Sequence, residues 1–177
     1  MLGLEERVYD RLILSGMVEL EEHGFADFSL RRAAQRAQVS CAAPYRHFKD
    51  KEAYIHAIVA DVHEKWELLS HEVERIFSQD AARRTVELCI ASLRFRLGNP
   101  HVLPVLSLAS REALSFDDGV VRAVDVYARE HGLDAEARER KLFTVRALLL
   151  GACAMIGTCP EEELLTLTRR ALEHELP

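Results

Sequence analysis

Apolar residues recur three and four positions apart along most of this chain, and few residues that break helices interrupt them. Only five prolines and eight glycines occur among 177 residues. Leu, Ala, Glu and Arg dominate, and all four are good helix formers. Strand-like alternation of Val, Ile and Thr is absent. The sequence therefore predicts an all-α fold of about nine helices.

Capping residues, glycines and prolines divide the chain into these helices. The side chains of Ser29, Ser40 and Asp50 are predicted N-caps, because each can accept a hydrogen bond from the first turn that follows it. Phe25 and Phe28 are predicted to anchor the core next to the first helix. The expected helices span about 4–22, 29–37, 40–47, 50–77, 81–97, 118–131, 134–158 and 160–175, with a further segment at 101–115 that Pro104 interrupts.

The segment from Asp27 to Lys51 is basic in an otherwise acidic chain. It holds six basic and two acidic residues, a balance of +4, whereas the whole chain has a net charge of −6. Two short helices joined by a short link, with a long helix directly behind them, have the spacing of a helix-turn-helix unit. A local positive face of this kind is typical of proteins that contact phosphates.

One run of residues in this segment resembles a known family. Gly24-Phe25 precedes the run from Ser29 to Ser40, and Pro44-Tyr45-Arg46-His47-Phe48-Lys49-Asp50-Lys51-Glu52-Ala53 follows. The most diagnostic part is Val-Ser, four residues, then Tyr-x-His-Phe-x-x-Lys-Glu. About the first 55 residues are similar to the DNA-binding domain of the TetR family of bacterial regulators. The resemblance implies a homodimeric, ligand-responsive repressor that binds a pseudo-palindromic operator.

The resemblance also implies DNA-contacting roles for nine residues. The recognition helix, which faces base edges, holds Ser40, Cys41, Ala42, Ala43 and Arg46. The expected phosphate contacts are Tyr45, His47 and Lys51. Ser29 is expected to cap the second helix and to contact the DNA backbone. Arg46 is the candidate for reading guanine. The sequence departs from the family at Gln38 and Ala42, where glycine is usual, and at Pro44. Cys41 is either an inert contact residue or a thiol switch.

The chain is expected to have two domains. Residues 1–53 form the DNA-binding domain and residues 54–177 a helical domain for ligand binding and dimerisation, with the helix at about 50–77 bridging both. A cavity for a small apolar effector is expected inside the second domain, because bundle interiors are common ligand sites. An ordinary filled core is the alternative. The candidate lining residues are Cys89, Leu93, Phe95, Leu103, Leu106, Phe116, Tyr127 and Leu150.

The last two predicted helices carry more apolar surface than one packing face can bury, which indicates an interface. A two-fold four-helix bundle between subunits follows from this surplus, and a fully internal hairpin is the alternative. The candidate interface residues are Leu142, Val145, Leu149, Ala152, Met155, Leu164, Leu165 and Leu172.

Other functions leave weaker patterns. No nucleophile and base, glycine-rich phosphate loop or HExxH motif occurs, so the protein is not expected to be an enzyme or to need a cofactor. No metal site is expected, although a metal-sensing variant using His63 and Glu67 is one alternative, and a helical scaffold with vestigial DNA binding is another. The four cysteines and the absence of a long apolar stretch predict a cytoplasmic protein with reduced thiols and no membrane contact.

Overall fold

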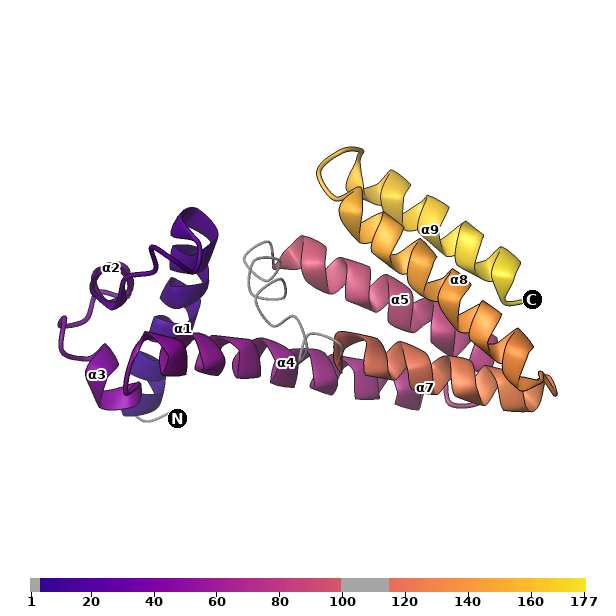
Figure 1. Cartoon of the computed structure of the whole chain (residues 1–177), viewed down its shortest axis with the longest axis horizontal. Coiled ribbons are helices and arrows are strands. Elements are labelled where there is room, and N and C mark those ends of the chain that lie inside the picture. The colour runs from indigo at the N-terminus through magenta and orange to yellow at the C-terminus, as the bar shows by residue number, and fades with distance from the viewer. Residues whose placement is uncertain (1–3, 100–114) are drawn as a thin grey trace. The chain divides into compact units, whose positions relative to one another are not determined.

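The computed structural model describes residues 4–99 and 115–177, and these residues are helical with no strand among them. Figure 1 shows the eight described helices. They are α1 (Leu4–His23), α2 (Leu30–Arg36), α3 (Pro44–His47), α4 (Lys51–Ile76), α5 (Ala81–Gly98), α7 (Ser115–Glu130), α8 (Ala135–Ala154) and α9 (Glu161–Glu175). The all-α prediction is confirmed. The segment expected at 101–115 lies almost wholly outside the described residues.

The described residues divide into two compact units, 4–64 and 65–99 with 115–177. The boundary falls within α4, after Glu64. None of the helices in the described ranges has both the length and the apolar character that crossing a bilayer requires.

In the first unit, α1 packs against α2 and against the N-terminal part of α4, next to an aromatic core. Phe48 stacks on Tyr54 with ring centroids 4.1 Å apart, and Phe28 meets the edge of the same ring at 5.3 Å. The Tyr54 hydroxyl donates a hydrogen bond to the Leu12 carbonyl, and burial raises the pKa of this phenol. Gly16 lets the helices approach, because a Cβ there would lie 2.6 Å from the end of Ile58.

Two phenylalanines that the sequence predicts as core anchors behave differently. Phe28 is buried, but Phe25 is 42% exposed, so that prediction is wrong for Phe25. The Lys51 ammonium lies over the Phe25 ring, 4.8 Å from its centroid. This cation–π contact gives the Phe25 ring a favourable partner at the surface.

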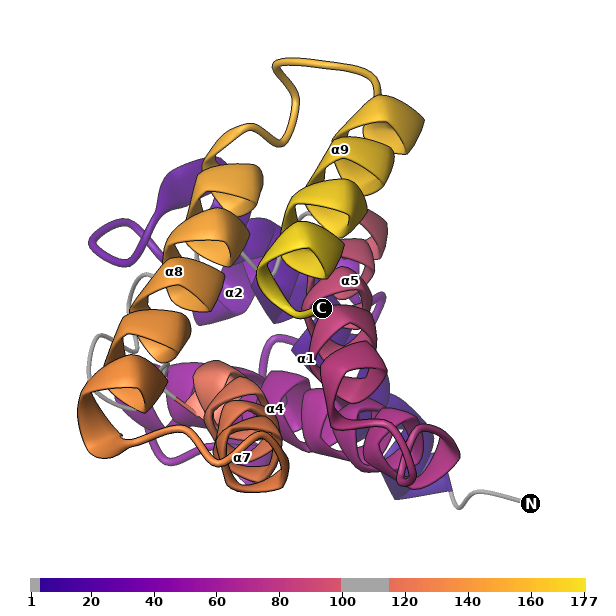
Figure 2. The ribbon, with the colours of Figure 1, turned by 90° about the vertical axis from the view of Figure 1, so that its right-hand side faces the viewer.

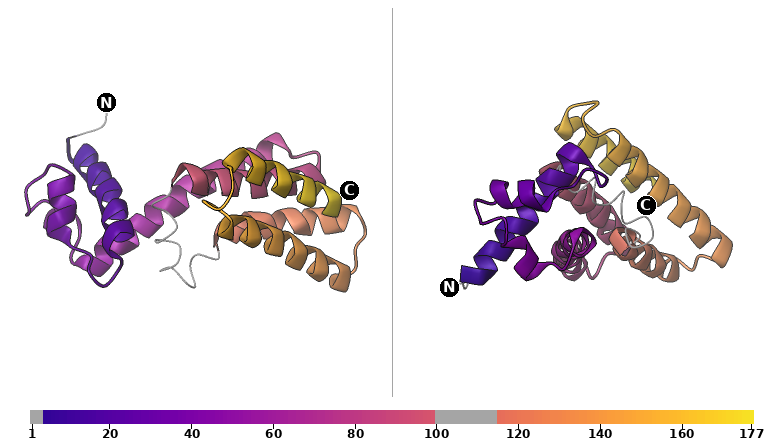
Figure 3. Two further views of the ribbon diagram at one scale, coloured as in Figure 1. Left: turned by 90° about the horizontal axis from the view of Figure 1, so that it is seen from above. Right: turned by 60° about the vertical axis from the view of Figure 1, so that its left-hand side comes forward.

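The second unit is a helical bundle in which α5 contacts α7, α8 and α9. Figure 2 and Figure 3 show α8 and α9 side by side, joined by the loop that follows Ala154. The Arg169 guanidinium donates to both oxygens of Glu87, at 2.5 and 2.9 Å, and so ties α9 to α5. This bidentate pair lowers the pKa of the Glu87 carboxyl.

Candidate nucleic-acid interface

The basic segment forms two helices, α2 and α3, joined by residues 37–43. Ser29 caps α2 as predicted, since its Oγ accepts from the Arg32 N–H at 3.4 Å. Asp50 caps α4 in the same way, through the Ala53 N–H at 2.8 Å. Both caps satisfy N–H groups that have no partner within their helix.

The third predicted helix, 40–47, is shorter than expected. Helix α3 begins at Pro44, and Ser40 is not its N-cap. A helix starting at Ser40 would need the N–H of residue 44 to bond to the Ser40 carbonyl, and proline has no N–H. The Ala43 N–H bonds to that carbonyl instead, at 2.9 Å, and closes a turn.

Most of the predicted base-facing residues lie at the surface. Ser40, Cys41, Ala42 and Arg46 are exposed, and Tyr45, the predicted phosphate contact beside them, is 64% exposed. Ala43 is the exception: it is 3% exposed and belongs to the core, so the expected base contact from this residue is not supported. The predicted recognition surface therefore consists of the turn before α3 and the outer side of α3.

His47 and Lys51 are partly engaged with protein groups. The half-buried His47 ring meets the edge of Tyr9 at 5.9 Å between centroids. The Lys51 Nζ donates to the Ala26 carbonyl at 2.8 Å, which joins the loop after α1 to the start of α4. An ammonium group has three donors, so this bond leaves two for another acceptor.

The six basic side chains of the segment fall into two groups. Arg32 and Arg36 form ion pairs with Glu19 and Glu22 of α1. Arg31, Arg46 and Lys49 are exposed and have no ion-pair partner among the described residues, and Lys51 has none there either. The charge available to phosphates is therefore smaller than the sequence suggests.

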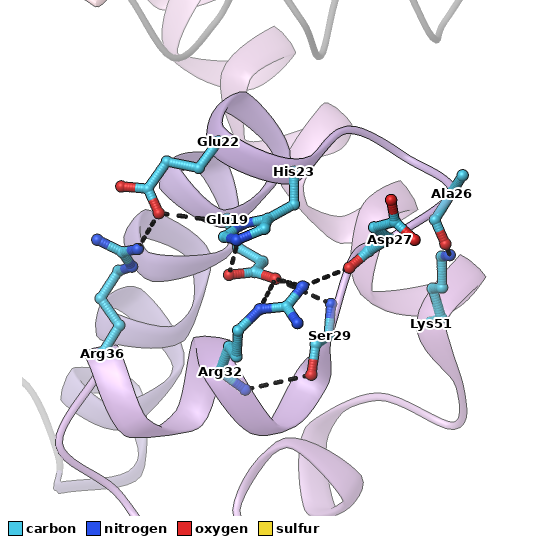
Figure 4. A network of polar contacts seen from close by, with 9 residues as sticks. All are labelled: Glu19, Glu22, His23, Ala26, Asp27, Ser29, Arg32, Arg36 and Lys51. Carbon is cyan, nitrogen blue, oxygen red and sulfur yellow. Dashed lines mark hydrogen bonds and ion pairs between the residues drawn. The ribbon is translucent and has the colours of Figure 1, made fainter.

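Figure 4 shows the network that holds α2 on α1. Glu19 is completely buried, and its Oε1 accepts from the Ser29 N–H at 3.1 Å and from the Arg32 Nε at 2.7 Å. The Arg32 guanidinium also donates to the Asp27 carbonyl. Sequence reasoning missed Glu19. The signal was an acidic residue next to Leu20 on the apolar stripe of the first helix.

The residues that form these first helices match a known protein family. Residues 12–58 match the model of the bacterial regulatory proteins of the tetR family. Residues 12–58 are therefore similar to the DNA-binding domain of this family. None of the curated protein sequences is significantly similar to the chain.

Solved structures of transcriptional regulators share the fold over most of the chain. FadR from Bacillus subtilis, a transcriptional regulator solved with stearoyl-CoA, is 14% identical with a TM-score of 0.71 and covers 95% of this chain and 97% of its own. A TetR transcription regulator from Haloarcula marismortui is 18% identical, with a TM-score of 0.69 and 96% of both chains covered. The fatty acid degradation regulator FadR from Bacillus halodurans is 18% identical, with a TM-score of 0.67, and covers 96% of this chain and 100% of its own.

Gln38 stands where glycine is usual in the TetR family. The backbone conformation of this residue explains why glycine suits the position. Gln38 has φ 55°, in the left-handed region. The Gln38 N–H bonds to the Gln35 carbonyl and the Val39 N–H to the Ala34 carbonyl, each at 3.0 Å, which is a Schellman motif. Gly132 occupies the same position at the end of α7, with φ 62°.

The substitution Gln38→Gly is therefore expected to stabilise the protein. A left-handed conformation costs a residue with a Cβ about 1–2 kcal/mol, part of which the flexibility of unfolded glycine offsets. We expect a gain of about 1 kcal/mol in the free energy of unfolding, measured by urea denaturation. The reciprocal change Gly132→Gln is the control, because a Cβ at that position meets no atom within 4 Å. Gly132→Gln is expected to lower the free energy of unfolding by a similar amount. Equal stability of both variants and the parent would show that the left-handed conformation carries no cost at these positions.

The residues predicted for the dimer interface mostly face the interior of their own unit. Only Met155, at 45% exposed, lies at the surface, and Leu165 is half-buried. The other six are buried core residues: Leu142, Val145, Leu149, Ala152, Leu164 and Leu172. The second half of α8, from Leu142, is apolar almost all round, so periodicity alone cannot tell its inward face from its outward face. The large apolar side chains exposed on these two helices and the loop between them are Phe143, Leu150, Met155 and Leu167.

The residues predicted to line the effector cavity are partly buried in the core and partly exposed to solvent. Cys89, Leu93 and Tyr127 are buried in the core of the second unit, and Phe95 is half-buried with its ring 5.8 Å from Trp66. Leu150 is 66% exposed on α8, so it does not line an interior cavity. Leu103, Leu106 and the side chain of Phe116 lie outside the described residues. A pocket of about 650 Å³ opens elsewhere in this unit, between the ends of α5, α7 and α9. Its lining combines charged residues such as Glu87 and Arg169 with apolar residues such as Val86 and Leu176.

Glu67, which the metal-sensing alternative combines with His63, forms an ion pair with His71, one turn further along α4. Its Oε2 lies 3.6 Å from the His71 Nε2.

Proposed function

We propose that this protein is a sequence-specific, ligand-responsive transcriptional repressor that acts as a homodimer. The observation that carries the proposal is the exposed surface of Ser40, Cys41, Ala42, Tyr45 and Arg46, presented by a TetR-family helix-turn-helix domain. Regulators of this family bind DNA and are in general not enzymes. As a bacterial regulator it would act in the cytoplasm, where its thiols stay reduced.

In this proposal residues 1–53 bind DNA and residues 54–177 bind the ligand and form the dimer. Each subunit places the turn before α3 and the outer side of α3 in a major groove. Because the dimer has two-fold symmetry, the half-sites lie about 34–36 Å apart on a pseudo-palindrome. Tyr45, His47, Lys51 and Ser29 contact phosphates, and the free donors of Lys51 lie at the start of α4, where a helix terminus favours an anion.

Arg46 is expected to read a base. It is exposed on α3, and a guanidinium can pair with guanine through two hydrogen bonds. The substitution Arg46→Ala should cost about 1–3 kcal/mol at one base pair and relax the preference there, as measured by binding to duplexes mutated at each position. Lys51→Ala is the comparison, because a phosphate contact should weaken all sequences alike and reduce the salt slope by about one. A uniform loss for Arg46→Ala would refute its base-reading role.

The dimer surface in this proposal is the outer face of α8. Phe143, Ala147, Leu150 and Ala154 are exposed at intervals of four, three and four, which is the spacing of a helix–helix seam. Gly151 is also exposed, and together with the alanines it allows close approach. Two copies of this face, with Met155 and Leu167 beside it, would form a four-helix interface.

The effector is proposed to be a small apolar molecule bound within residues 54–177. Three of its expected contacts, Cys89, Leu93 and Tyr127, are buried among apolar neighbours. The B. subtilis FadR structure holds stearoyl-CoA, which makes long-chain acyl-CoA the first effector to test. The test is release of the protein from its selected DNA site. To be a useful switch, the effector must bind the two conformers with affinities that differ by several kcal/mol.

A further inference from the structure

The C-terminal turn of α1 brings together three potential metal ligands. Glu19, Glu22 and His23 each offer one atom, and these atoms all lie within 4.8 Å of one another. The His23 Nδ1 is 3.4 Å from the Glu19 Oε2 and 3.9 Å from the Glu22 Oε2. Residues three and four apart share a face of a helix, so the backbone of α1 itself holds this arrangement.

Glu19 gives a second, independent indication of a ligand. Its side chain is completely buried, and its Oε1 is occupied by Ser29 and Arg32. Its Oε2 is aimed at His23 and accepts a hydrogen bond from none of the described residues. A buried carboxylate oxygen without a hydrogen bond is costly, and a bound ion is one of the few ways to compensate for it.

We propose that Glu19, Glu22 and His23 bind a divalent first-row transition-metal ion, with Zn²⁺ as the representative. Zn²⁺ bonds to imidazole nitrogen and carboxylate oxygen are about 2.0–2.2 Å long, which places tetrahedral ligands about 3.3 Å apart. The 3.4 Å separation between His23 Nδ1 and Glu19 Oε2 matches that value. One imidazole with two carboxylates favours such an ion over Ca²⁺ or Mg²⁺, which prefer oxygen ligands alone.

The exposure of the ligands fits an ion that enters from solvent. The side chains of His23 and Glu22 are 37% and 45% exposed, so water can reach the fourth coordination position. Glu22 can rotate by the small amount that closes the 3.9 Å gap, because its side chain is at the surface. Glu19 supplies the fixed, buried ligand.

Arg32 and Arg36 become the outer partners of this site. Each donates to one of the ligating carboxylates, and a carboxylate has enough lone pairs to serve an arginine and a metal together. Outer hydrogen bonds of this kind orient metal ligands. Since both arginines belong to α2, a bound ion strengthens the attachment of α2 to α1. Their positive charges lower the affinity, and we expect a micromolar dissociation constant.

The test is calorimetric titration of ZnCl₂ into the full chain after chelator treatment. We expect one ion per chain at this site and a higher melting temperature with Zn²⁺, since an ion that binds only the folded protein stabilises it. His23→Ala and Glu22→Gln should each weaken binding about tenfold or more and abolish the thermal shift. Both side chains are at the surface, so the variants are expected to fold, which circular dichroism checks.

The control is His63→Ala, which removes a histidine of α4 and should leave Zn²⁺ binding unchanged. Three results would overturn the proposal: no heat of binding at millimolar ZnCl₂, equal affinity in the parent and His23→Ala, or an equal loss in His63→Ala. Equal affinity would assign the ion to other ligands, such as the cysteines. DNA binding does not enter this experiment, so its outcome is independent of the proposed regulatory function.

Discussion

Two glutamates on the outer face of α8, introduced by the double substitution Phe143→Glu and Leu150→Glu, are expected to make the protein monomeric. Phe143 and Leu150 are 73% and 66% exposed, so neither is needed to fill the core of its own unit. Across a two-fold axis, each new carboxylate would meet its own copy or an apolar partner and would lose water without gaining a counter-ion.

The loss of the dimer is expected to reduce operator binding strongly. Two linked heads bind far more tightly than one, so affinity for a two-half-site duplex should fall by about 10²–10⁴. Sedimentation velocity gives the oligomeric state, and fluorescence anisotropy with the selected duplex gives the affinity. Secondary structure should be unchanged.

A matched pair of substitutions on α4 serves as the control for this experiment. Leu68 and Ile76 are 68% and 57% exposed, close to the values for the α8 pair. The variant Leu68→Glu with Ile76→Glu carries the same added charge and should remain dimeric. If this control dissociates while the α8 variant stays dimeric, the interface lies on α4 and not on α8.

Removal of the Arg32 guanidinium is expected to destabilise the DNA-binding unit by about 2–4 kcal/mol, because breaking a pair that involves a buried charge is costly. Glu19 is completely buried, and Arg32 pairs with it from a side chain that is 44% exposed. In Arg32→Met the carboxylate keeps the Ser29 N–H but loses its cation. Urea denaturation measures the loss, and weaker DNA binding should accompany it because Ser29 and α2 are no longer held.

Two further variants separate this ion pair from a general effect of charge. Arg31→Met removes an exposed arginine from the same turn of α2 and should change stability by less than about 0.5 kcal/mol. The double variant Glu19→Met with Arg32→Met should cost less than the sum of the single variants, since it removes both charges. Additive effects would mean that the two side chains are not coupled.

The sequence predicted the fold and the position of the DNA-binding domain because the signals there are local. Ser29 and Asp50 cap their helices through side-chain bonds three residues long, and such bonds can be read from a short segment. The roles of the residues around Arg46 came from the resemblance to the TetR family, which rests on a short run of residues. The start of the third helix was wrong by several residues because Pro44 limits which backbone bonds can form upstream.

Sequence-based predictions failed where burial or pairing depends on segments that are distant along the chain. Leu149 and Leu150 are adjacent and equally apolar, yet one is 6% and the other 66% exposed. The positions of α5, α7 and α9, which all contact α8, determine which of the two leucines faces inward. Glu19 was missed because its partners Ser29 and Arg32 are 10 and 13 residues away along the chain.

The most direct test of sequence-specific DNA binding is in vitro selection of binding sites from a random duplex library at two salt concentrations, with the parent and Arg46→Ala in parallel. We expect the parent to enrich one two-fold symmetric site that persists at the higher salt, and Arg46→Ala to lose preference at one position in each half-site. Recovery of unrelated sequences whose binding disappears at the higher salt would contradict this expectation, because phosphate contacts alone would then explain all of the binding.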